Sequence, residues 1–193
     1  MREAATMTAI EFVDTHFLNG EAYAFSDNPD RYRSFRNEIG LKLSILENRI
    51  RLVGSGKLGF SLNKDHLLQR FCRESDLDLV VIAAEIFDAA TLELLQNSRE
   101  LTLAGADEKH RLRKTRENVF NGYLRPDQLP LGSTLNRDWF PKLAGPYESD
   151  VARSRPVKAW LFKSLEHAQL CYRAYIEQIQ PSIRRLLESR GDL

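Results

Sequence analysis

The chain alternates between segments with helical spacing of apolar residues and short runs that are mainly apolar. Helical spacing occurs in five segments, residues 7–18, 31–48, 88–99, 107–119 and 165–180. Short apolar runs typical of buried strands occur in three segments, residues 50–53, 77–83 and 157–162. This mixture predicts an α/β (α+β) fold, in which a small mixed sheet is flanked by helices and followed by a C-terminal helical segment.

The length of the chain indicates one domain. A chain of 193 residues suits a single compact unit with a normal core. We expect N-terminal helices in residues 1–48, a sheet core with insertions in residues 49–162 and C-terminal helices in residues 163–193. Residues 121–151 are rich in Gly and Pro, which predicts an irregular loop, and Pro181 predicts a new turn after the last helix.

Composition excludes several classes of protein. Hydrophobic residues make up 42% and charged residues 28% of the chain, which is typical of neither a disordered nor a membrane protein. The N-terminus lacks a continuous apolar core, and the two cysteines, Cys72 and Cys171, lie far apart in sequence. We therefore expect a cytoplasmic protein with free thiols and no contact with a membrane. The net charge of +1 gives no overall sign of nucleic-acid binding.

Two aspartates interrupt the start of the second apolar run. Residues i and i+2 of a strand point to the same face, so Asp76 and Asp78 project together while Leu77, Leu79 and Val81 pack on the other face. Two neighbouring carboxylates repel each other unless a cation lies between them. Carboxylate ligands on a strand suit Mg²⁺, whose shell is completed by substrate phosphates. The alternative is structural, with both aspartates serving only as turn residues at the strand entry.

A glycine-serine turn follows the first apolar run. The backbone amides of Gly54 and Ser55 and the serine hydroxyl are suited to phosphate oxygens. Lys57 and Lys64 are the nearest sources of positive charge for a triphosphate. A P-loop is excluded, because that motif needs glycine where Arg51 stands and serine or threonine where Leu58 stands. Together with the aspartates, the turn predicts a site for a metal ion and a triphosphate.

The pair Gly54-Ser55, with Ser75-Asp76-Leu77-Asp78-Leu79, resembles the signature of the DNA polymerase beta-like nucleotidyltransferase superfamily. The wider string at residues 54–62 is similar to a bacterial, defence-associated branch of it. The resemblance implies Mg²⁺-dependent transfer of a nucleoside monophosphate from a nucleoside triphosphate, with ATP expected, to an acceptor hydroxyl. It implies that Asp76 and Asp78 are the catalytic residues and metal ligands. The expected nucleotide-binding residues are Gly54, Ser55, Lys57 and Ser75.

The chain departs from the superfamily pattern in two places. The spacer of 20 residues between Ser55 and Asp76 is unusually long, so a helical turn or loop is expected over residues 63–71. A third carboxylate, usual on a later strand, is missing from residues 157–162, and the nearest candidates are Glu148 and Asp150. An alternative function therefore stays open. It is a catalytically degenerate nucleotide-binding or protein-interaction module, for example in a bacterial defence or toxin–antitoxin system.

Residues 109–116 contain five Lys or Arg side chains on a predicted helix. The segment is either a solvated helix face or a contact for a polyanion, such as the triphosphate or an RNA acceptor. Tyr123 and Arg125 follow it and could form a platform for a base. The sequence leaves four classes of acceptor open: a protein hydroxyl, an RNA 3′ end, a small molecule and another nucleotide.

Overall fold

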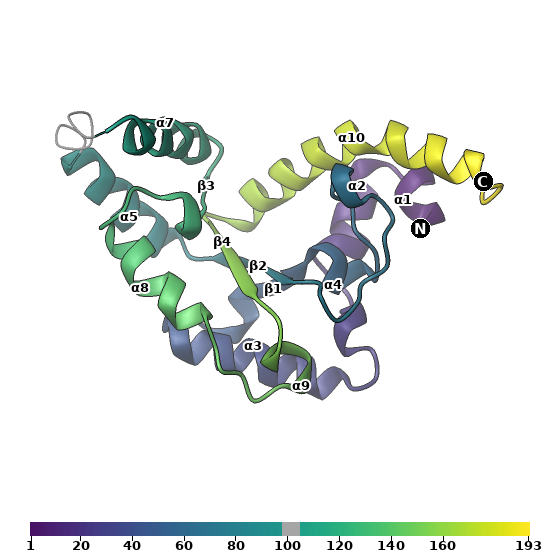
Figure 1. Ribbon diagram of the computed structural model, residues 1–193, viewed down its shortest axis with the longest axis horizontal. Helices are drawn as coiled ribbons and strands as arrows, with labels where there is room; N and C mark the ends of the chain where they lie inside the picture. The colour runs from purple at the N-terminus through teal and green to yellow at the C-terminus, as the bar shows by residue number, and fades with distance from the viewer. Residues whose placement is uncertain (98–104) are drawn as a thin grey trace.

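The computed structural model describes residues 1–97 and 105–193 (Figure 1). It confirms the mixed α+β class, with helices around a four-stranded mixed sheet in the order β1-β2-β4-β3. The strands are β1 (Ile50–Val53), β2 (Leu77–Ile82), β3 (Tyr123–Leu124) and β4 (Val157–Phe162). Strand β1 runs antiparallel to β2, β4 parallel to β2, and β3 antiparallel to β4.

The helices flank this sheet on both faces. The α-helices are α1 (Arg2–Thr6), α2 (Ala9–Phe12), α3 (Pro29–Leu43), α4 (Gly54–Leu58), α5 (Ala84–Gln96), α7 (Ala106–Phe120), α8 (Thr134–Leu143), α9 (Asp150–Arg153) and α10 (Leu165–Ser189). Segment η1 (Val13–Phe17) continues α2 as a π-helix, and the short 3-10 turns are η2 (Tyr23–Phe25), η3 (Glu47–Arg49), η4 (Lys64–His66) and η5 (Pro126–Gln128). No helix within residues 1–97 and 105–193 is long and apolar enough to span a bilayer.

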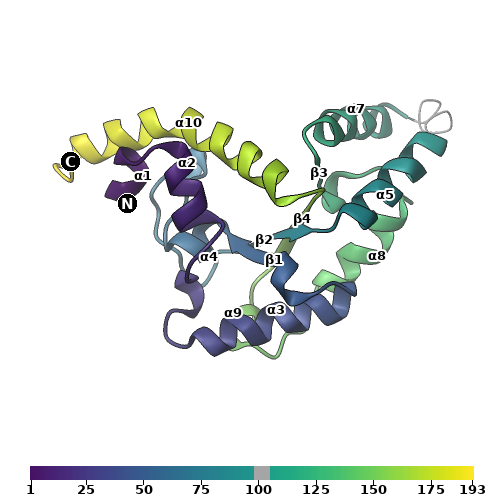
Figure 2. The same ribbon diagram turned by 180° about the vertical axis from the view of Figure 1, so that it is seen from behind.

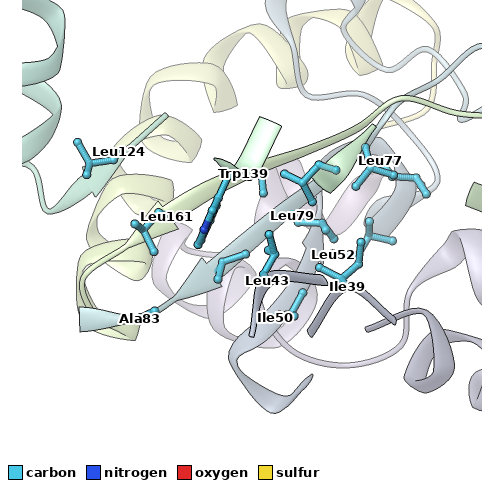
Figure 3. Packing of buried hydrophobic residues seen from close by; sticks show 14 of the residues in the cluster. Ile39, Leu43, Ile50, Leu52, Leu77, Leu79, Ala83, Leu124, Trp139 and Leu161 are labelled. Atoms are coloured by element: carbon cyan, nitrogen blue, oxygen red, sulfur yellow. The ribbon is translucent and has the colours of Figure 1, made fainter. Parts of the chain in front are cut away.

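Successive side chains of β2 point to opposite faces of the sheet, and each face belongs to a separate hydrophobic core. Leu77, Leu79 and Val81 are buried on one face, together with Ile39 and residues of α5 and α8. Figure 3 shows Leu77 and Leu79 beside side chains of α3 and β1, with Trp139 of α8 nearby. The predicted packing of these three residues away from the aspartates is therefore confirmed. Val80 points to the opposite face, where it joins a second core built from α1, α2, η1 and α10.

Helix α10 crosses the second face of the sheet (Figures 1 and 2). The sequence predicts an end near residue 180, but the helix continues through Pro181 to Ser189. The proline removes one backbone donor, yet Ile183 and Leu187 continue the buried apolar stripe beyond it. Tertiary packing against the N-terminal helices thus outweighs the local preference of proline.

The structure corrects two further expectations. The predicted helix at residues 31–48 ends at Leu43, because Ser44 takes a left-handed conformation with φ of 58°. Residues 121–151 are not one irregular loop, since they contain β3, η5, α8 and the start of α9. Leu135, Trp139 and Leu143 form the buried stripe of α8 at helical spacing. The last part of the predicted helix at residues 88–99 lies outside the described residues.

Candidate functional site

The predicted glycine-serine turn forms the start of helix α4, and the ends of β1 and β2 bring it beside the aspartate pair. Val53 pairs with Asp78 in the antiparallel register, so the next residue, Gly54, lies directly beside the Asp78 side chain. Gly54 has a φ of +66°, and a Cβ at this position would lie 3.0 Å from Oδ2 of Asp78. Glycine is needed here both for the backbone conformation and for this close approach.

A cleft of about 1030 Å³ opens at this point. Its lining includes Gly54, Ser55, Ser75, Asp76 and Asp78, which the sequence singles out together. The volume is at the upper end of the range for small-molecule sites, about 300–1,000 Å³. Five of the six residues expected to bind metal or nucleotide thus lie around one cavity.

The long spacer forms one wall of the cleft. Residues 59–71 fold back through a bridge between Phe60 and Arg70, with the short turn η4 at the tip. Lys64, His66 and Arg70 line the cleft from this segment. Across from it, Tyr175 of α10 donates its hydroxyl hydrogen to the Leu62 carbonyl over 2.7 Å. The predicted insertion therefore places positive charge and backbone around the cavity.

Asp78 is the more buried of the two aspartates. Burial raises the pKa of its carboxyl to about 6, and the neighbouring charge of Asp76 adds to this effect. Lys158 and Arg125 oppose the shift with their positive charges. The carboxylate form of Asp78 is therefore less favourable than that of an ordinary aspartate, and a further positive charge nearby would stabilise it.

A lysine lies beside the aspartates on the neighbouring strand. Lys158 pairs with Asp78 in the parallel register of β2 and β4, and its ammonium donates to Oδ2 of Asp76 over 2.5 Å. This hydrogen bond raises the pKa of Lys158. The strand position next to the aspartates thus carries a cation where a third carboxylate would be expected from the superfamily pattern.

The two candidates for a third carboxylate lie elsewhere. Asp150 pairs with Arg153 at 3.2 Å, and the backbone N–H of Glu148 donates to the Glu38 carboxylate at 3.2 Å. Neither is among the described residues that line the cleft. Neither candidate therefore supplies a third carboxylate to the cleft: Glu148 contacts Glu38 of α3, and Asp150 begins α9.

Lys57 also points away from the cavity. Its side chain is only 5% exposed, and its ammonium donates to the Gly20 carbonyl oxygen over 2.6 Å. Burial lowers the pKa of Lys57 to about 8. Among the described lining residues Lys57 does not occur, whereas Lys64 does. The short helix α4 turns Lys57 toward the N-terminal segment, which local sequence spacing does not reveal.

Aromatic residues complete the cleft. Trp160 follows Lys158 on the same face of β4, and the guanidinium carbon of Arg125 lies 4.7 Å from the centre of its ring. Tyr123 stacks on Trp160 with 5.3 Å between ring centres. The sequence favours Trp160 as a core residue, but it is half-buried and lines the cavity together with Tyr172 of α10. Arg125 lines the cavity with Trp160, whereas Tyr123 is not among the described lining residues, and a base platform stays a prediction.

The basic helix α7 is not part of the cleft lining among the described residues. Leu112 and Thr115 are buried on one side of this helix, and Arg111 donates to the carbonyl oxygens of Asp127 and Leu129. Arg111 therefore holds the segment after β3 in place. The remaining basic side chains of this helix, Lys109, Arg113, Lys114 and Arg116, are exposed.

The carboxylates present fit a metal ion only in part. Among residues 1–97 and 105–193 no group of three or more His, Cys, Asp or Glu side chains could hold an ion. Asp76 and Asp78 offer carboxylate oxygens for an ion that arrives with phosphate oxygens, and the Asp78 carboxylate lies against Gly54. Comparison of the chain with family models, curated proteins and solved structures gave no match.

Proposed function

We propose that the protein is a nucleotidyltransferase of the DNA polymerase beta-like type, which binds a nucleoside triphosphate in the cleft of about 1030 Å³. The observation that carries the proposal is the position of Gly54, directly against the Asp78 carboxylate across the antiparallel pair of β1 and β2. The first residues of helix α4 thereby meet two carboxylates on one face of a strand. This combination suits the phosphates of a nucleotide.

Each part of the cleft has a role in this proposal. The Gly54-Ser55 turn and Ser75 donate hydrogen bonds to phosphate oxygens, and Lys64 and Arg70 add positive charge from the loop. Trp160 and Tyr172 offer ring faces on which a base can stack. A Mg²⁺ ion bound with the triphosphate would be held by Asp78 and Asp76 and would neutralise phosphate charge.

The transfer step needs an acceptor hydroxyl placed in line with the α-phosphorus. The acceptor oxygen forms a bond to this phosphorus while the bond to the bridging oxygen breaks, and pyrophosphate leaves. The hydroxyl proton passes to water in the open cleft. The protein contributes mainly by orienting the two reactants and by surrounding the phosphates with fixed charge.

A second candidate function is favoured by the ion pair between Lys158 and Asp76. An ammonium already bound to one carboxylate reduces the capacity of the pair for a catalytic ion. In this case the protein is a nucleotide-binding module without turnover, of the kind that would serve in a bacterial defence or toxin–antitoxin system.

Incubation with each α-phosphate-labelled nucleoside triphosphate, in the presence of a cell extract, separates the two functions. Label transferred to a protein, an RNA or a small molecule supports the transferase and identifies the class of acceptor. Loss of transfer in Asp76→Asn and Asp78→Asn, but not in Asp65→Asn, would assign it to the aspartate pair, because Asp65 lines the cleft outside that pair. Binding without transfer supports the module, and absence of both contradicts the proposal.

A further inference from the structure

The ammonium of Lys158 lies in the same space as the aspartates. Among the described residues it donates one hydrogen bond, to Asp76, although an ammonium has three donors. The side chain is 54% exposed and lines the cleft. A ligand can therefore reach the Lys158 ammonium without first breaking its bond to Asp76.

The positive charge of Lys158 occupies the neighbourhood in which a divalent ion would have to bind. Asp76 already has the Lys158 ammonium at hydrogen-bonding distance. The positive charges of Lys158 and Arg125 also act on the Asp78 carboxyl, where they lower the pKa that burial raises. A divalent ion at Asp76 would stand close to the ammonium and would be repelled by it. The ammonium thus competes with a divalent ion for the Asp76 carboxylate. Like that ion, it presents a positive charge to phosphate.

Other cations surround the same space. Lys64 and Arg70 line the cleft from the loop and Arg125 from the segment after β3. They originate from two separate parts of the chain, and the fold brings them to one cavity with Lys158, which lies in a third. The same lining contains the carboxylates of Asp65, Glu74, Asp76 and Asp78, so a polyphosphate would be held by direct contact with individual cations and not by a net positive charge of the cleft.

We infer that Lys158 is a phosphate-binding residue, and that it allows the cleft to hold a nucleoside polyphosphate without a divalent ion. This inference rests on the proposed function and makes it more specific, since it separates nucleotide binding from the metal requirement of transfer. The ion is needed for the chemical step alone.

The test compares ATP binding by calorimetry in EDTA and in MgCl2. We expect the natural protein to bind ATP with affinities that agree within about threefold in the two buffers. Lys158→Met should lose about tenfold to a hundredfold of its affinity in EDTA, the cost of a charge-assisted hydrogen bond. It should regain much of this loss in MgCl2, because Asp76 is then free to bind the ion.

Two controls keep the result interpretable. Lys163→Met removes a lysine just beyond the same strand that pairs with Asp88 at 2.8 Å, and Lys163 is not among the described lining residues of the cleft. It should leave ATP affinity unchanged in both buffers. Lys158→Gln provides a second variant that keeps a polar side chain, and Mg²⁺ alone should bind Lys158→Met more tightly than the natural protein.

The outcomes separate the inference from the function on which it rests. If ATP binds the natural protein only in MgCl2, or if Lys158→Met binds ATP in EDTA as well as the natural protein does, the inference is wrong and nucleotide binding still stands. If no nucleoside triphosphate binds in either buffer, the proposed function fails and the inference with it.

Discussion

The hydroxyl of Tyr175 on α10 and the carbonyl oxygen of Leu62 in the loop at residues 59–71 lie 2.7 Å apart and join two walls of the cleft. The two residues are separated by 113 positions in sequence, so this hydrogen bond ties the loop to a helix formed much later in the chain. The loop carries Lys64 and Arg70, and its position determines where their positive charges lie in the cleft.

Replacing Tyr175 by Phe should loosen this loop while leaving the core intact. One hydrogen bond of this kind contributes about 0.5–1.5 kcal/mol, and the aromatic ring is retained in the variant. We expect faster amide hydrogen exchange in residues 59–71 and weaker ATP binding. Tyr23→Phe is the control, because no hydrogen bond of the Tyr23 hydroxyl occurs among the described residues. Unchanged exchange in Tyr175→Phe would contradict the link between the two walls.

Replacing Gly54 by Ala should destabilise the fold and weaken nucleotide binding. A left-handed alanine costs about 1–2 kcal/mol, and the added methyl group would also press against Oδ2 of Asp78 at 3.0 Å. Gly132→Ala isolates the backbone cost, because Gly132 has a φ of +87° and no neighbouring atom within 4 Å among the described residues. Chemical denaturation should show a larger loss for Gly54→Ala than for Gly132→Ala. Equal losses would mean that the approach to Asp78 contributes nothing.

Replacing Asp78 by Asn should abolish nucleotidyl transfer and stabilise the fold. Burial raises the pKa of this carboxyl to about 6, so the charged form costs stability at neutral pH. The amide removes that charge, and we expect a gain of about 1–3 kcal/mol in the free energy of unfolding at pH 7. Asp65→Asn, at an exposed loop position, should change neither property. A large loss of stability in Asp78→Asn would indicate a structural role for this aspartate.

Replacing Lys57 by Met should remove a pH dependence of stability. Burial lowers the pKa of Lys57 to about 8, below its ordinary value of 10.5, so the unfolded chain binds more protons between these two values. The stability of the natural protein should therefore rise relative to the variant as pH increases from 8 to 10, by about 2–3 kcal/mol. Urea unfolding across this range measures the difference. Lys64→Met, which removes an exposed lysine, should show no such trend.

Local patterns in the sequence predict the strands and the facing aspartates well. The apolar run at residues 157–162 coincides with β4, and Leu77 and Leu79 are buried opposite the aspartates. These features depend only on the twofold alternation of a strand, which is a local property. The same kind of local pattern does not predict helix α8, because the glycines and prolines around it outweigh its short apolar stripe.

Contacts between distant segments are the part that local patterns miss. The bond between Lys158 and Asp76 joins positions 82 residues apart and depends on the register of two parallel strands. The burial of Lys57 depends in the same way on Gly20, 37 residues earlier. Neither relationship leaves a periodic signal, so the sequence alone assigns Lys57 to the triphosphate and leaves Lys158 without a role.

The N-terminal helices influence the cleft from a distance. Gln180 donates to the carbonyl oxygen of Met7 over 2.8 Å, and Arg184 donates to that of Ala5 over 2.7 Å. These bonds fix the outer half of α10, whereas Tyr172 and Tyr175 on its inner half face the cavity. We therefore expect a partner that pulled α1 away from α10 to change the shape of the cleft without touching any described residue that lines it.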